Sequence, residues 1–116
     1  MEIKKGFNVQ VWCGLKENET NILHTLEEAK TICQKFVDEA GDCVSVTPTE
    51  FIYSNGNEIG FVVGFIQYPR FPRKKKIIKN RAIHLAMRLM LELNQYKVTV
   101  TTPKKSIMLE NNTLNK

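Results

Sequence analysis

The order of the hydrophobic patterns along the chain constrains its fold more than any other feature of the sequence. Strict alternation over residues 7–13 predicts a half-buried strand with its apolar side chains on one face. After a polar loop, Thr25-Leu-Glu-Glu28 matches a capping box, the usual start of a helix. Apolar residues then recur at helical spacing until Gly41, which predicts the end of that helix.

A β-hairpin is predicted next. Residues 43–47 are rich in β-branched side chains, Pro48 is expected to interrupt this strand, and residues 50–53 resume it. Ser54-Asn-Gly-Asn57 predicts a tight turn, because Asn-Gly tolerates two positive φ angles. The returning strand, residues 58–68, is apolar on both faces and is therefore expected to be central or covered on both sides.

The rest of the chain predicts a second helix over residues 74–93, a strand over 96–102 and a short final strand over 106–109. This order indicates an α+β fold of the βαββαβ type, with an extra C-terminal strand as an option. We expect an antiparallel or mixed sheet with two helices on one face. Residues 1–110 would form a single domain, and residues 111–116 a flexible tail.

Charge is divided unevenly along the 116 residues, although the net charge is only +5. Residues 1–58 hold 5 Lys or Arg against 10 Asp or Glu, whereas residues 59–116 hold 12 against 2. Between Glu58 and Glu92 there is no acidic residue. Such polarity favours binding of an anion, for example a ligand that carries phosphate groups.

Several classes of protein and of chemistry are not indicated. No apolar run approaches the roughly 20 residues that cross a bilayer, and the polar N-terminus does not resemble a signal peptide. Three cysteines without CxxC spacing predict reduced, buried thiols and no metal site. The sequence has no P-loop, dinucleotide fingerprint or nucleophile elbow. We therefore expect a binding protein without a cofactor, and not an enzyme.

The loop of residues 68–76 concentrates the features of a phosphate site. Arg70 and Arg73 can grip phosphate oxygens bidentately, and Tyr68 and Phe71 offer rings on which a base can stack. The loop leads into a helix N-terminus, where free N–H groups favour anions. The alternative is an ordinary solvated loop with Phe71 tucked into the core.

Two further groups of residues extend this candidate site. Asn80, Arg81 and Arg88 lie on or beside one face of the second helix and can prolong the basic loop into a groove. Thr47, Glu50, Phe51 and their neighbours can hydrogen-bond or stack against a nucleoside. The alternatives are a solvated polar stripe on the helix and a set of edge-strand residues around a proline bulge.

Two motifs resemble a family of phage proteins that act against the bacterial Thoeris defence system. They are Val46-Thr-Pro-Thr-Glu-Phe-Ile-Tyr53 and Gly64-Phe-Ile-Gln-Tyr-Pro-Arg-Phe-Pro72; Asn80-Arg-Ala82 and Gln95-Tyr-Lys-Val98 follow them. Proteins of this family are sponges that sequester a cyclic ADP-ribose isomer. The resemblance covers about residues 7–110.

The resemblance implies non-catalytic binding of a cyclic nucleotide signal, with cyclic oligonucleotides as further ligands. It also implies a dimer-based homo-oligomer, up to a hexamer, encoded by a phage or prophage and acting in the bacterial cytoplasm. Arg70, Phe71, Arg73, Asn80 and Arg81 are the site residues carried over from it, followed by Thr47, Glu50 and Phe51. The run Arg73-Lys-Lys-Lys76 is more basic than the family leads one to expect. A small nucleic-acid-binding domain is the alternative.

Overall fold

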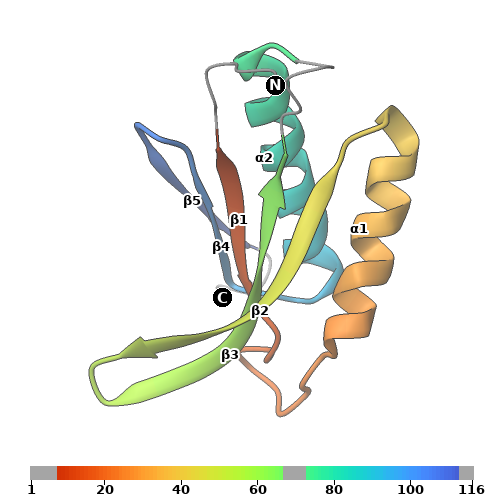
Figure 1. Cartoon of the computed structure of the whole chain (residues 1–116). Helices are drawn as coiled ribbons and strands as arrows, with labels where there is room; N and C mark the ends of the chain where they lie inside the picture. The colour runs from red at the N-terminus through yellow and green to blue at the C-terminus, as the bar shows by residue number, and fades with distance from the viewer. Residues whose placement is uncertain (1–7, 67–72, 113–116) are drawn as a thin grey trace.

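The computed structural model describes residues 8–66 and 73–112, which fold into five strands and two helices in the order βαββαββ (Figure 1). The elements are β1 (Val9–Gly14), α1 (Leu26–Ala40), β2 (Val44–Tyr53), β3 (Gly56–Phe65), α2 (Lys75–Glu92), β4 (Lys97–Thr101) and β5 (Ser106–Glu110).

The strands form one sheet in the order β2-β3-β1-β4-β5, and every neighbouring pair is antiparallel. Strand β1 lies in the middle, between β3 and β4, so each helical crossover leads from one strand to a strand that is not its neighbour. This is the split connectivity predicted from the sequence. The α+β fold class is confirmed, β5 is the extra C-terminal strand, and β3 is a central strand as expected.

Both helices pack on the same face of the sheet, as Figure 1 shows. Alternate residues of the three inner strands point toward the helices and are fully buried, and each such aliphatic or aromatic side chain stabilises the fold by about 1.5–3 kcal/mol. The sheet contributes Val9, Val11, Cys13, Phe61, Val63, Phe65, Val98 and Val100 to this core, and α2 contributes Ile78, Ala82, Leu85, Ala86, Leu89 and Met90.

The two ends of α1 follow the predicted caps. The Thr25 hydroxyl accepts a hydrogen bond from the Glu28 N–H at 3.1 Å, and the Glu28 carboxylate accepts one from the Thr25 N–H at 3.2 Å. Gly41 ends the helix with φ 73°, a left-handed conformation in which a side chain would be strained. In contrast, α2 begins at Lys74 without a side-chain cap.

The hairpin corrects two details of the sequence analysis. Pro48 does not interrupt the strand, since β2 runs through it and Pro48 lies opposite Phe61. Because β2 is an edge strand, the missing N–H of proline costs no ladder hydrogen bond when it faces away from β3. The turn is also shorter than predicted: Asn55 alone has a positive φ, 66°, and Gly56 is already paired with Tyr53.

The C-terminal segment is ordered further than predicted. Asn111 is buried, and its N–H donates to the Tyr96 carbonyl at 2.8 Å. The expected flexible tail thus does not begin at residue 111, and residues 113–116 lie outside the described part of the chain.

Two glycines of β3 provide a test of the packing. A Cβ on Gly60 would lie 2.4 Å from the carbonyl oxygen of Cys13 and 2.5 Å from the Phe51 ring, whereas a Cβ on Gly64 would meet only the Ser45 hydroxyl, at 3.0 Å. We expect Gly60→Ala to lower the free energy of unfolding by about 2 kcal/mol, because backbone has to move. Gly64→Ala is the matched control and should change it by about 0.5 kcal/mol or less. Equal losses in urea unfolding would contradict this packing.

Candidate functional site

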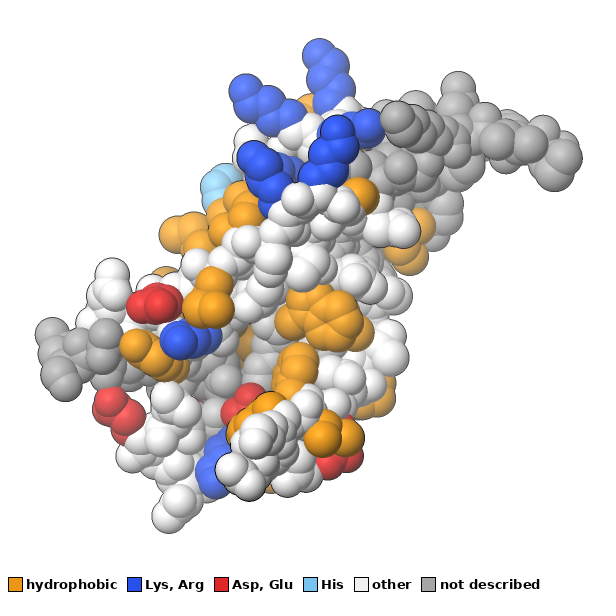
Figure 2. Space-filling view, turned by 90° about the vertical axis from the view of Figure 1, so that its left-hand side faces the viewer, with side chains coloured by type: hydrophobic (Ala, Val, Ile, Leu, Met, Phe, Trp, Pro, Cys, Tyr) orange, Lys and Arg blue, Asp and Glu red, His pale blue; other side chains and the backbone are white. Residues whose placement is uncertain are grey.

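In the described part of the chain, no helix covers the second face of the sheet. The register places Trp12, Phe51 and Glu58 on this open face, together with Gly14 and Gly60. Figure 2 looks toward the tip of the β2–β3 hairpin and shows hydrophobic side chains around a hollow in this surface. Polar and aromatic groups thus gather where the sheet has no helical cover.

Glu58 and Gln95 point at each other above Gly14. A Cβ on Gly14 would lie 2.9 Å from the Glu58 Oε1 atom and 2.8 Å from the Gln95 Oε1 atom. The glycine leaves room for both side-chain oxygens, and any larger residue would displace them.

Gln95 is held rigidly in this position. Its side chain is almost completely buried, at 5% exposure, and its Nε2 atom donates to the carbonyls of Lys16 and Leu93, both at 3.1 Å. The amide nitrogen is thereby engaged, so the oxygen is turned toward Glu58. Two acceptors, one of them negatively charged, converge on the same small space.

The Glu58 carboxylate is half-buried and makes no hydrogen bond or ion pair with any residue in the described ranges 8–66 and 73–112. A partly buried carboxylate without a partner costs free energy, because it loses hydration and gains nothing in exchange. Such a group is a candidate for binding a ligand that carries positive charge or hydroxyl donors.

Aromatic rings lie beside this carboxylate. Trp12 and Phe51 make an edge-to-face contact with their centroids 6.4 Å apart, and the Trp12 indole N–H donates to the Thr101 hydroxyl at 2.9 Å. The Tyr53 ring lies over Gly56, where a Cβ would approach it to 2.6 Å. These rings can stack on a base or contact a cation.

A hollow of about 410 Å³ lies between the hairpin and the loop that follows β1. That volume suits a nucleoside-sized ligand. Its lining includes Glu17, Glu58, Tyr53, Asn57 and Lys16. We define this hollow, together with Gly14 and Gln95, as the acidic hollow.

A histidine held between two carboxylates contacts Glu17, one of the residues that line the acidic hollow. His24 donates through Nε2 to Glu17 at 2.7 Å and through Nδ1 to Glu28 at 2.8 Å. Burial on its own would lower the pKa of His24, but the hydrogen bonds and charges of Glu28 and Glu17 outweigh it and raise the pKa. The hydrogen bond from His24 is the main cause that holds the pKa of Glu17 below its ordinary value.

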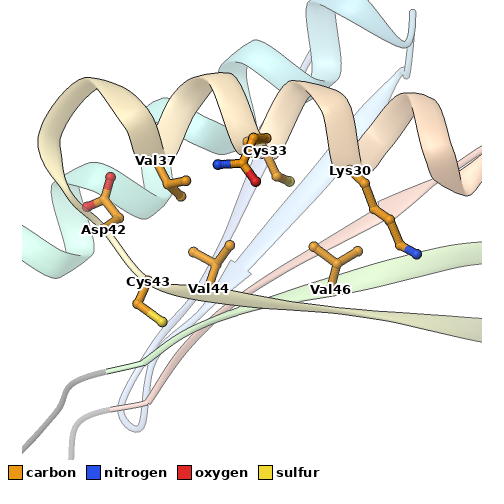
Figure 3. A pocket seen from close by; sticks show the side chains of 8 residues that line it. Lys30, Cys33, Val37, Asp42, Cys43, Val44 and Val46 are labelled. Carbon is orange, nitrogen blue, oxygen red and sulfur yellow. The ribbon is translucent and has the colours of Figure 1, made fainter.

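A second hollow, also of about 410 Å³, lies between α1 and β2 (Figure 3). Val37 and Cys33 of the helix face Val44 and Val46 of the strand, so its middle is apolar. Burial raises the pKa of Cys33 to about 11, and that thiol is therefore a poor nucleophile at neutral pH. This hollow offers less chemistry than the acidic hollow.

Two of the arginines predicted to bind phosphate have a carboxylate partner within the chain. Arg81 donates to Asp42 at 2.6 and 3.0 Å, and Arg73 also forms an ion pair with Asp42. The Asp42 side chain is only 1% exposed. Burial alone would raise the pKa of Asp42, but the hydrogen bonds and charges of Arg81 and Arg73 hold it below its ordinary value.

The Arg81 guanidinium has further contacts on α1. It stacks 3.8 Å from the centre of the Phe36 ring and donates to the Phe36 carbonyl at 3.1 Å. Arg88 pairs with Glu39 at 2.9 Å, also across the two helices. These side chains tie α1 to α2 and to the start of β2, and their role in ligand binding stays a prediction.

Among the remaining predicted residues, the structure does not bring those that it describes into one site. Thr47 is exposed on the open face, while Glu50 points to the other side of the hairpin and accepts from Asn57. Phe51 packs on Trp12, beside the acidic hollow. Asn80 is exposed on α2, away from the sheet. Tyr68, Arg70 and Phe71 lie outside the described residues.

Sequence reasoning missed the acceptor pair Glu58 and Gln95. One signal was available, since Glu58 is the last acidic residue before the long stretch without carboxylates. Gln95 stands in the motif Gln95-Tyr-Lys-Val98, but nothing in that motif links it to Glu58, because it follows α2 and reaches Glu58 only through the crossover to β4. The spacing of residues along the sequence does not predict which side chains of different segments lie close together in the fold.

Other kinds of site are not found in the described ranges. There, no group of three or more His, Cys, Asp or Glu side chains is arranged to hold a metal ion. None of the helices in these ranges is both long and apolar enough to cross a membrane.

The comparisons with known proteins find similarity at the level of structure. No protein-family model and no curated protein sequence matches it. A phage SAM lyase in its apo state matches with a TM-score of 0.73 and 15% identity, over 91% of this chain and 90% of that one. A phage SAM lyase in complex with S-methyl-5'-thioadenosine matches with a TM-score of 0.67 and 14% identity, over 92% and 91%. The chain thus shares its fold with these two solved structures.

This similarity corrects one conclusion of the sequence analysis. We expected a protein that is not an enzyme, because no catalytic motif is present. That expectation is wrong, since the similar solved structures are those of an enzyme. Solved structures that share nearly the whole fold are those of lyases, and a lyase needs neither a P-loop nor an activated nucleophile.

The buried Asp42 should stabilise the fold in a pH-dependent way. We expect Asp42→Asn to lower the free energy of unfolding by about 2–3 kcal/mol at about pH 7, less than for a fully buried ion pair because both arginines are partly exposed. The stabilisation is present above the ordinary Asp pKa, near 3.9, and is lost as the pH falls through the lowered value. Urea unfolding should give converging stabilities below about pH 4; a gap that stays constant would contradict this account.

His24 should show the opposite dependence on pH. Its raised pKa means that the two carboxylate contacts stabilise the fold fully below the ordinary His pKa, near 6.5, and are lost as the pH rises through the raised value. Thermal unfolding of the wild type and of His24→Gln should therefore differ at about pH 6 and converge at higher pH. A difference that grows on going to alkaline pH would refute the assignment.

Proposed function

We propose that the protein is a lyase that cleaves S-adenosylmethionine or a closely related sulfonium nucleoside in the acidic hollow. The observation that carries this proposal is the half-buried Glu58 carboxylate, which has no partner in the described residues and lies next to the Gln95 oxygen and an aromatic surface. The shared fold of the phage SAM lyases supports the same reading.

The charge of the substrate fits this site. S-adenosylmethionine has a sulfonium, an ammonium group and ribose hydroxyls, all of which are attracted to carboxylate and amide oxygens. Its adenine can stack on an aromatic ring such as Tyr53. A phosphate-bearing ligand would instead meet Glu58 and Glu17 as like charges, with Lys16 as the one basic side chain lining the hollow among the described residues.

The proposed reaction breaks the bond between sulfur and the aminobutyrate chain. The electron pair of this bond stays on sulfur, which turns the sulfonium into the neutral thioether of S-methyl-5'-thioadenosine. The aminobutyrate fragment closes to a lactone when its carboxylate oxygen attacks the carbon that sulfur leaves. Otherwise it becomes an alkene, when the adjacent carbon loses a proton to solvent and the C–H electron pair forms the new double bond. No water, oxidant or second substrate is consumed.

Glu58 is the residue we assign to hold the positively charged part of the substrate. Gln95 fixes the place of this contact, and the Trp12–Phe51 pair shields it on the side of the sheet. Exclusion of water by these rings would strengthen the electrostatic attraction.

Phage origin, action in the host cytoplasm and a role against a host defence belong to the same proposal. Removal of a small nucleotide-derived metabolite is a direct way for a phage protein to change its host. The resemblance to Thoeris anti-defence proteins favours a cyclic nucleotide as a second candidate ligand, and the homo-oligomer remains a prediction.

Incubation of the purified protein with S-adenosylmethionine tests the proposal. We expect S-methyl-5'-thioadenosine to appear on liquid chromatography with mass spectrometry. The lactone and the alkene are isomers of equal mass, so the proton NMR spectrum of the second product identifies which of them forms. Substrate that stays intact at stoichiometric enzyme would overturn the proposal. A parallel incubation with a cyclic ADP-ribose isomer, followed by heat release, tests the second candidate.

Glu58→Gln should lower kcat/KM about 100-fold, which corresponds to about 2.7 kcal/mol of lost interaction with the cation. Glu50→Gln is the matched control, since Glu50 is an exposed carboxylate on the other side of the same hairpin. It should change kcat/KM less than about twofold. Equal activity in both variants would place the site elsewhere.

Gly14→Ala tests the geometry without removing a charge. Its Cβ would displace the ends of two side chains rather than backbone, but one of them is the buried Gln95 amide with its two hydrogen bonds. We therefore expect the melting temperature to fall by about 5 °C while the fold is retained. We expect kcat/KM to fall about tenfold because the Glu58 carboxylate moves. Unaltered kcat/KM in this variant would argue against Glu58 as the contact.

A further inference from the structure

The outward face of α2 is apolar where a surface helix is normally polar. Ile77, Met87 and Leu91 are 44%, 45% and 55% exposed, and they lie on the side of the helix opposite the buried residues Ile78, Ala82, Leu85 and Leu89. We call the outward face, formed by Ile77, Asn80, His84, Met87 and Leu91, the α2 seam.

The spacing of the α2 seam is that of a helix pair. Its residues follow one another at intervals of three, four, three and four, the repeat by which two helices pack along a shared stripe. All five side chains are exposed in the single chain. We propose that the α2 seam is a homodimer interface, in which α2 packs antiparallel against α2 of a second copy.

The pattern of polar residues selects this orientation and its register. When two antiparallel copies cross at the level of Ala82, Ile77 lies opposite Met87 of the second copy and Asn80 lies opposite His84. Two apolar side chains, Ile77 and Met87, then meet, and an amide meets an imidazole with which it can share a hydrogen bond. Leu91 lies at the end of the contact, opposite the residues that precede α2. A shift by one repeat would place His84 against Met87 and Asn80 against Leu91, so polar groups would be buried without partners.

Charge favours the same arrangement. The N-terminal turns of α2 hold Lys74, Lys76 and Lys79 and no acidic residue, an unfavourable placement beside the positive end of the helix dipole. The other end of α2 has Glu92. Antiparallel pairing brings Lys74 and Lys76 of each copy to within about 6 Å, along the axis, of the level of Glu92 and of the negative end of the dipole of the other copy. Figure 2 shows Lys and Arg gathered at the upper end of the molecule, where α2 begins.

This interface leaves the acidic hollow free. Helix α2 packs on one face of the sheet, and Glu58 lies on the other. The dimer is thus independent of the proposed lyase function, and each can be tested without the other.

Analytical ultracentrifugation at about 50 µM tests the interface. We expect a species of twice the 13.4 kDa of one chain for the wild type, and a monomer for Met87→Lys. Met108→Lys is the matched control, because Met108 is similarly exposed, at 56%, but lies on β5; this variant should remain dimeric. A monomeric wild type, or a dimer that Met87→Lys does not weaken at least tenfold, would overturn the proposal.

Cross-linking tests the register. A mixture of Asn80→Cys chains with His84→Cys chains should form a mixed disulfide dimer at least fivefold more readily than either variant alone, since the two positions face each other only in the antiparallel pair. Far-ultraviolet circular dichroism of each variant checks that the fold is retained. Equal cross-linking in the mixture and in the separate variants would contradict this register.

Discussion

Burial of the sheet on one face only is the constraint on which the rest of the structure depends. Alternate residues of β1, β3 and β4 meet the helices and form the core, so the intervening residues are left on a face without helical cover in the described part of the chain. Trp12, Phe51 and Glu58 occupy that face because the pleat puts every second side chain there. The same alternation of side chains therefore places one set of residues in the core and the other set at the candidate site.

Local patterns account for most of what the sequence predicted correctly. The Thr25 capping box, the Gly41 stop and the alternation in β1 depend on neighbours within a few residues, and all three are found. Pro48 was misjudged because its tolerance depends on the position of β2 at the sheet edge, which only the topology decides. Gln95 was missed because its contact with Glu58 joins segments far apart in the chain.

The number of charged residues in each half of the sequence does not predict where unpaired charge lies in the folded protein. The basic second half suggested an anion site, yet Arg73 and Arg81 turn toward Asp42 from the acidic half, and Arg88 turns toward Glu39. These pairs cross the joints between α1, α2 and β2 and stabilise the fold. Among the described residues, Glu58 in the acidic hollow is the half-buried carboxylate without a partner. Counting charges by segment cannot distinguish paired groups from unpaired ones, and the structure can.

The central claim is that the acidic hollow takes an adenosine with a sulfur substituent. Titration of ¹⁵N-labelled protein with S-methyl-5'-thioadenosine, followed by NMR, tests it most directly because this molecule has no bond left for the enzyme to break. We predict saturable shifts at Gly14, Glu58 and the Gln95 side-chain amide, with none along α2. Shifts confined to the N-terminal turns of α2, or no shifts at millimolar ligand, would contradict the account.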